Sequence, residues 1–196
     1  MRNFQKLVQE SPRTRISNDS DHIKIYDDFL PSQYFDKVKE YYTGSQVGWH
    51  YMNCIDTQGD YNSSTIICDE IDNWQLTNVS YLNDQPVNES YKTIQPLLGF
   101  ITEKITPVKT VIKIKTNLNP RTDKIVKHGF HVDFTYESCT TALLYINTNN
   151  GYTEFTCGTK VNSRENRLVT FPTTTLHTGT TCTDQQNRIV VNLNYF

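Results

Sequence analysis

The stretch KHGFHVDF, residues 127–134, holds the residues around which we expect the rest of the chain to be organised. Side chains alternate between two faces in an extended strand, so residues two apart, such as His131 and Asp133, point the same way. An imidazole and a carboxylate would then converge on one point. Another imidazole, His177, follows after several strand-like segments, and Arg188 comes eleven positions later.

A single His-x-Asp triplet is weak evidence for a site, because such triplets arise easily by chance. Its context is more informative, since the segments after it have strand character and the second His is expected in a turn among them. Two His and one carboxylate on one side of a metal, with the opposite positions open, are the ligands typical of non-haem Fe(II) oxygenases. The strand-like runs cover residues 141–147, 151–155, 167–172, 176–179 and 188–195.

The order of these parts resembles the core of the 2-oxoglutarate/Fe(II)-dependent oxygenases, in particular the prolyl-4-hydroxylase-like group and its small members from tailed phages. The resemblance covers residues 109–196. The family pattern is His-x-Asp, a strand bearing Tyr, a Gly-led strand ending in Phe, an Arg-hydrophobic-Phe-Pro strand, a distal His followed by Gly, and an Arg or Lys further on. This chain matches it, in order, with His131 and Asp133, Tyr145, Gly151 and Phe155, Arg167 to Pro172, His177 and Gly179, and Arg188.

The resemblance implies a mostly β fold with flanking helices. Its core would be a double-stranded β-helix, a jelly roll of the cupin type, backed by two or more α-helices. We expect a single domain over residues 21–196, with the β-helix core at about 109–196 and a polar N-terminal arm at 1–20. Residues 45–86, where short candidate strands such as Thr65–Cys68 alternate with polar loops, correspond to the substrate-facing lid of the family.

Two helices are predicted from local signals. The first begins at Pro31 and Ser32 and ends before Gly44, and its aromatic stripe is expected to pack under the β core. The second begins near Asn88, a suitable capping residue, and is kinked at Pro96 or starts close to it.

Composition excludes several other classes of protein. The net charge of −2, with both signs mixed along the chain, gives no reason to expect a nucleic-acid partner. No run is long and apolar enough for a membrane span, and the start of the chain does not look like a secretory signal. Five Cys without a CxxC pair suit free thiols in a reducing compartment. We therefore expect a cytoplasmic protein, in the host cytoplasm if it is phage-encoded.

The resemblance also assigns roles to residues. His131, Asp133 and His177 would hold Fe(II), and the remaining positions would accept 2-oxoglutarate and dioxygen. Ascorbate is a candidate reductant.

Arg188 is the candidate for binding the distal carboxylate of 2-oxoglutarate, because a buried carboxylate needs a charged and preferably bidentate donor. The alternative interpretation is that Arg188 is an exposed arginine at the start of a strand. This is the interpretation that we prefer for Arg167. Many related enzymes carry a Ser two residues beyond this arginine, and Val190 stands there instead. Tyr145 and Asn117 are further candidates for contacting the co-substrate.

The function expected from these features is hydroxylation of an unactivated C–H bond, with release of succinate and carbon dioxide. A peptidyl, prolyl-type substrate follows from the resemblance, and a nucleobase or a small metabolite remains an alternative. A binding module that has kept the fold without turnover and a zinc hydrolase using the same ligands are the other possibilities. The oligomeric state cannot be read from the sequence.

Overall fold

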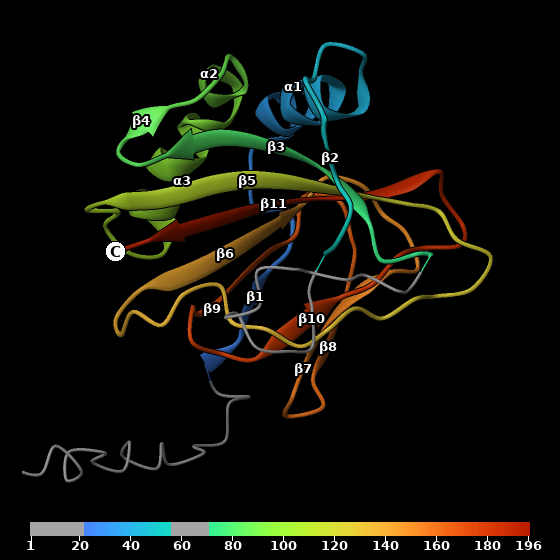
Figure 1. The fold of residues 1–196 in the computed structure, drawn as a ribbon. Coiled ribbons are helices and arrows are strands. Elements are labelled where there is room, and N and C mark those ends of the chain that lie inside the picture. Colours follow the sequence, from blue (N-terminus) through green and yellow to red (C-terminus); the bar gives the residue numbers. More distant parts are fainter. Residues whose placement is uncertain (1–21, 56–70) are drawn as a thin grey trace, which may run out of the picture.

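The computed structural model describes residues 22–55 and 71–196, which form two antiparallel β sheets and three helices (Figure 1). The larger sheet has eight strands in the order β1-β9-β6-β11-β5-β3-β2, with β4 paired to β3. The smaller sheet has the order β10-β7-β8. The strands are β1 (Lys24–Tyr26), β2 (His50–Met52), β3 (Gln75–Leu82), β4 (Gln85–Pro86), β5 (Val111–Pro120), β6 (Thr140–Tyr145), β7 (Tyr152–Phe155), β8 (Lys160–Asn162), β9 (Leu168–Pro172), β10 (His177–Gly179) and β11 (Asn187–Tyr195).

From β5 onward the chain passes back and forth between the two sheets. Strands β5, β6, β9 and β11 lie in the larger sheet, whereas β7, β8 and β10 lie in the smaller one. Between β5 and β6 the chain also visits the smaller sheet, because Lys127 bridges to Thr180 and His131 bridges to His177. This winding is a double-stranded β-helix, so the predicted fold class is confirmed.

Strand β11 separates two apolar cores. It is hydrogen-bonded to β5 on one side and to β6 on the other. Ile189, Val191 and Leu193 on one face pack in the same cluster as Val38 and Leu97 of the helices. This burial of alternate apolar side chains holds the helices against the outside of the larger sheet. The opposite face, which is turned toward the smaller sheet, carries Arg188, Val190, Asn192 and Asn194.

Helix α1 (Ser32–Thr43) has the predicted ends. Pro31 precedes its first residue, and at Gly44 an added Cβ would lie 2.8 Å from the carbonyl oxygen of Glu40. Phe35 and Tyr42 of the aromatic stripe are buried in the larger core, as expected.

The second predicted helix is divided into α2 (Ser90–Ile94) and α3 (Pro96–Lys104). Pro96 is the first residue of α3, where the missing N–H leaves no helical hydrogen bond unmade. The N-cap residue is Glu89 and not the predicted Asn88, which lies one residue earlier and whose Oδ1 accepts a hydrogen bond from the Ser90 N–H at 2.9 Å.

Strand β3 was not predicted, because polar residues occupy its buried positions. Asn78 and Ser80 are 2% and 0% exposed, respectively. Their polar groups are paired: Asn78 Nδ2 donates to Gly48 O at 2.9 Å, and the hydroxyl groups of Ser80 and Ser90 lie 2.6 Å apart. The hydrogen bonds come from segments distant in the sequence, so local pattern could not reveal them. Part of the expected lid is therefore a long strand inside the larger sheet.

Two further local expectations are wrong. Residues 127–134 form no continuous strand, only isolated bridges at Lys127 and His131, and His177 lies in β10 and not in a turn. Both results follow from long-range pairing, because His131 and His177 each donate a backbone N–H to the other's carbonyl oxygen, at 2.9 and 3.0 Å. Short β8 was also missed.

The expectation of free thiols throughout is wrong for one cysteine. Cys139, Cys157 and Cys182 are free, but Cys54 is disulfide-bonded. The number and spacing of Cys in the sequence do not show which of them lie close together in space, so the disulfide could not be predicted from them. None of the described helices is long and apolar enough to cross a membrane. The expected arm at 1–20 and the candidate strand Thr65–Cys68 lie outside the described residues, and the domain boundaries stay predictions.

Candidate metal and anion site

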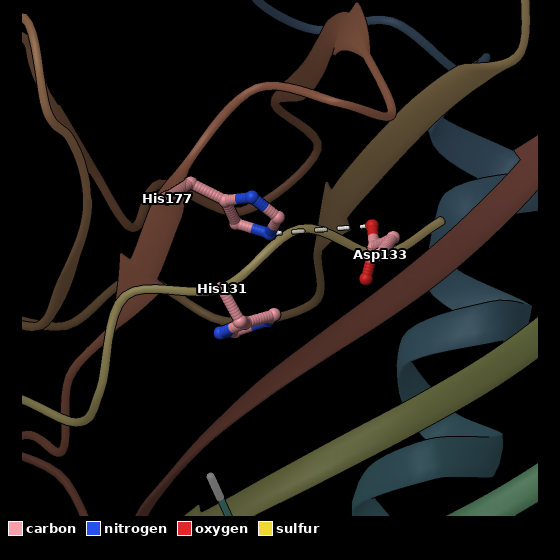
Figure 2. A group of neighbouring side chains, drawn as sticks. All are labelled: His131, Asp133 and His177. Atoms are coloured by element: carbon pink, nitrogen blue, oxygen red, sulfur yellow. Dashed lines mark ion pairs between the residues drawn. The ribbon is translucent and has the colours of Figure 1, made fainter. Parts of the chain in front are cut away.

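His131, Asp133 and His177 meet at one point between the two sheets (Figure 2). Their metal-binding atoms all lie within 4.8 Å of one another. The mutual backbone hydrogen bonds place the two histidines side by side, with ring centroids 4.7 Å apart. Asp133 faces them, with Oδ2 4.0 Å from Nε2 of His177. The structure thus brings together the three predicted ligands.

Backbone carbonyls fix the orientation of both imidazoles. Nδ1 of His177 lies 2.9 Å from Thr175 O, and Nδ1 of His131 lies 3.2 Å from Gly129 O. A carbonyl oxygen only accepts hydrogen bonds, so Nδ1 carries the proton in each ring. In the neutral tautomer Nε2 then has its lone pair available for a metal ion.

Aromatic side chains surround His177. The Phe171 ring packs against it edge-on, with centroids 4.7 Å apart, and the Phe155 centroid lies at 6.1 Å. Both phenylalanines are 1% exposed. The imidazole of His177 is therefore held between a fixed hydrogen bond and rigid apolar walls.

The Asp133 carboxylate is buried yet remains ionised. Burial is the largest influence and by itself would raise its pKa. His177 and the cation of Lys113, together with hydrogen bonds from Thr141 and Asn192, outweigh burial, so the pKa of Asp133 lies below its ordinary value. Two imidazoles and an ionised carboxylate are a donor set that suits Fe(II) and other divalent transition metals.

Arg188 lies in the same cavity and is 4% exposed. Its Nε donates to Ser163 Oγ at 2.8 Å, and its Nη2 donates to Thr153 Oγ1 at 3.1 Å. The alternative of an exposed arginine is therefore wrong. Arg167, by comparison, pairs with Asp27 near the surface, at 2.6 and 3.0 Å.

The guanidinium of Arg188 has no carboxylate to balance it among the described residues. Burial lowers its pKa, and the groups that raise it again are Tyr145 and Cys182, neither of which carries a carboxylate. An arginine keeps its proton even when buried, so the cavity contains a positive charge whose hydrogen bonds, within the part of the chain that the structure describes, go to the hydroxyl groups of Ser163 and Thr153. Such a charge favours an anionic ligand.

Tyr145 and Asn117 are placed differently around this cation. The Tyr145 ring centroid lies 5.5 Å from the guanidinium carbon, and its hydroxyl donates to Thr153 Oγ1 at 2.8 Å. Tyr145 is fully buried and is not part of the cavity wall. Asn117 does line the cavity, and its buried Oδ1 has no hydrogen-bond partner within the described ranges.

Strands β5 and β11 form a polar wall of the cavity. Lys115, Asn117 and Asn119 of β5 lie opposite Asn192, Val190 and Arg188 of β11, in that order. The sequence predicted Asn117 and Arg188 as site residues, but it did not predict Lys115, Asn119 or Asn192. The signal that could have found them is alternation, because polar residues at every second position of an apolar strand mark its inner face. The cavity is lined by Ile55, Gln75, Lys115, Asn117, Asn119, His128, His131, Asp133, Leu143, Thr153, His177, Gly179, Arg188, Val190 and Asn192.

Glycine at position 151 makes room for the Arg188 side chain. A Cβ at Gly151 would lie 2.7 Å from Arg188 Cδ and 2.7 Å from Thr181 O. Gly151→Ala is therefore expected to displace the guanidinium and to destabilise the fold by about 1–3 kcal/mol. Thermal unfolding and binding of 2-oxoglutarate check this prediction. Gly99→Ala on α3 is the matched control, since nothing lies within 4 Å of its added Cβ, and it is expected to stabilise the helix by about 0.5–1 kcal/mol. Equal behaviour of the two variants would contradict the packing argument.

Comparison with known proteins identifies the fold. No protein-family model and no curated protein matches the sequence. A prolyl hydroxylase from Trichoplax adhaerens, solved in complex with a peptide fragment of the hypoxia inducible factor oxygen degradation domain, is 16% identical with a TM-score of 0.58 over 90% of this chain and 84% of that one. A 2OG-Fe(II) oxygenase family oxidoreductase from Burkholderia pseudomallei is 9% identical with a TM-score of 0.61 over 90% and 86% of the two chains. The viral collagen prolyl hydroxylase of Paramecium Bursaria Chlorella virus-1 is 14% identical with a TM-score of 0.50 over 88% of each chain.

The class of fold is thus that of the 2-oxoglutarate/Fe(II) oxygenases, with prolyl hydroxylases among the structures that share it. This is the resemblance predicted from the order of motifs. At these identities the likeness concerns the fold, and the chemistry has to be argued from the residues of the site.

Proposed function

We propose that this protein is an Fe(II)- and 2-oxoglutarate-dependent oxygenase that hydroxylates a C–H bond. One observation carries the proposal: three potential metal ligands, His131, Asp133 and His177, share a cavity with a buried guanidinium that has no carboxylate partner among the described residues. A site that bound only a metal ion would not account for the buried guanidinium of Arg188. A dicarboxylic co-substrate accounts for both features, because one end can bind the metal while the other meets Arg188.

The residues of the cavity would divide the work as follows. His131, Asp133 and His177 hold the iron, and Arg188 binds the distal carboxylate of 2-oxoglutarate through guanidinium N–H groups. Ser163 and Thr153 keep the guanidinium in place, and they supply hydroxyl contacts that Val190 cannot. When bound, the iron supplies the oxidising chemistry that inserts one oxygen atom of dioxygen into the substrate while 2-oxoglutarate becomes succinate and carbon dioxide.

The proposed roles of Tyr145 and Asn117 are auxiliary. The Tyr145 ring supports the Arg188 guanidinium, and its hydroxyl holds Thr153, so it contributes through these neighbours. Asn117 presents an amide to the cavity directly and can bond the co-substrate. We propose a peptide with a prolyl-type side chain as substrate, in line with the peptide bound to the similar prolyl hydroxylase of Trichoplax adhaerens.

Conversion of labelled 2-oxoglutarate to succinate tests the proposed activity. The purified protein, supplied with Fe(II), ascorbate and oxygen, is expected to form succinate even without substrate, and prolyl-containing peptides are expected to increase the rate and to gain one oxygen atom. Metal-free protein and protein loaded with Zn(II) serve as controls and should be inactive. Binding of Fe(II) and 2-oxoglutarate without any succinate would overturn the proposal in favour of an idle binding module, and peptide cleavage by the Zn(II) form would favour a hydrolase.

A further inference from the structure

The carboxylate of Asp133 receives hydrogen bonds from three side chains on two strands. Asn192 Nδ2 donates to Oδ1 at 3.0 Å and to Oδ2 at 3.1 Å. Asn194 Nδ2 donates to Oδ2 at 3.1 Å, and the Thr141 hydroxyl donates to Oδ2 at 2.7 Å. These donors, Asn192, Asn194 and Thr141, are called the carboxylate clamp below.

Each member of the carboxylate clamp is deeply buried. Asn192 is 5% exposed, and Asn194 and Thr141 are 0% exposed. Burying a polar group is unfavourable unless it is hydrogen-bonded, and three such groups converge here on a single side chain. Asn194 Nδ2 also lies 3.0 Å from the Thr141 hydroxyl oxygen, so the three partners brace one another.

The chemistry of the clamp suits a metal ligand. Amide and hydroxyl groups donate hydrogen bonds without adding a positive charge, so the carboxylate stays anionic toward an ion on its other side. Asn192 reaches both carboxylate oxygens, which fixes the rotation of the carboxylate plane. Groups that hydrogen-bond a metal ligand in this way orient it and tune its affinity for the metal.

We infer that Asn192 and Asn194, together with Thr141, are positioning residues that set the orientation of Asp133 for metal binding. This inference rests on the proposed function, since it requires that Asp133 is a metal ligand. The clamp lies on β11, which also carries Arg188, and on neighbouring β6, and β11 is paired with another strand on both of its edges.

Binding of Co(II) alone to the metal-free protein tests the inference without turnover. Asn192→Leu, which keeps the size of the side chain, is expected to weaken Co(II) binding by about 10- to 100-fold, the usual effect of losing such a partner. Asn192→Asp replaces the donor with a like-charged acceptor and is expected to weaken binding at least as much. Thr141→Val is a nearly isosteric change at a second clamp position and is expected to weaken Co(II) binding as well. It provides the test if the Asn192 variants fold poorly. The visible spectrum of bound Co(II), which reports ligand number and geometry, should change in each variant that still binds.

Asn162→Leu is the matched control. It makes the same substitution at an exposed position of β8 that is not part of the cavity lining, so Co(II) affinity should be unchanged. If wild-type protein binds Co(II) and the Asn192 and Thr141 variants bind it equally well with the same spectrum, the inference is wrong while the proposed function stands. If wild-type protein does not bind Co(II), the proposed function falls, and the inference falls with it.

Discussion

Asp133→Ala is expected to abolish succinate formation and to weaken Co(II) or Fe(II) binding by more than the roughly 100-fold expected for loss of an outer hydrogen-bond partner. The reason is that the variant removes the only anionic ligand of the three and leaves two neutral imidazoles. It also leaves the amides of Asn192 and Asn194 without their acceptor, so a moderate loss of stability is expected too.

Asp36→Ala is the control for this experiment, because Asp36 is an exposed acid on α1. Activity is to be measured as succinate released from labelled 2-oxoglutarate, and folding is to be checked by circular dichroism. Full activity of a folded Asp133→Ala variant would refute the assignment of this residue and the proposed mechanism with it.

Arg188→Met is expected to raise the KM for 2-oxoglutarate by on the order of 10²- to 10³-fold, in line with the roughly 3–5 kcal/mol attached to breaking a buried ion pair. Metal affinity should change little, because the guanidinium contacts Ser163 and Thr153 and none of the proposed ligands. Without co-substrate the variant should be at least as stable as the wild type, since the charge it removes is buried beside neutral hydroxyls.

Arg167→Met provides the comparison. This arginine also stands beside a strand start, but it pairs with Asp27 and so joins the β1 region to the β9 region. Its replacement is expected to lower Tm slightly and to leave the KM for 2-oxoglutarate unchanged. An unaltered KM in Arg188→Met, measured by initial rates of succinate release, would show that the co-substrate carboxylate binds elsewhere.

The sequence predicted the fold class, both helical regions and most core strands because their signals are local or follow a fixed order. Strand β11 illustrates this, since apolar residues alternate from Ile189 to Tyr195 and the opposite face begins with Arg188. The convergence of His131, Asp133 and His177 was predictable from the order of motifs, although the expected strand around His131 does not form.

What the sequence did not reveal depends on contacts between distant segments. The inward polar residues of β3 look like loop residues until Gly48 and Ser90 are seen to satisfy them. Asn192 and Asn194 were not predicted as part of the site, because their partner Asp133 lies about sixty residues away in the sequence. The disulfide at Cys54 likewise could not be deduced from the spacing of Cys along the chain.

Strand β11 also bears on which diacids the proposed site would accept. Arg188 and Asn192 are four residues apart on it, a backbone separation of about 13 Å that pairing with β5 and β6 on both edges keeps constant. Under the proposed function, this strand holds Arg188 at a set backbone distance from Asn192, the residue that hydrogen-bonds the candidate ligand Asp133. A dicarboxylate with one methylene fewer or more than 2-oxoglutarate is therefore expected to bind more weakly than 2-oxoglutarate.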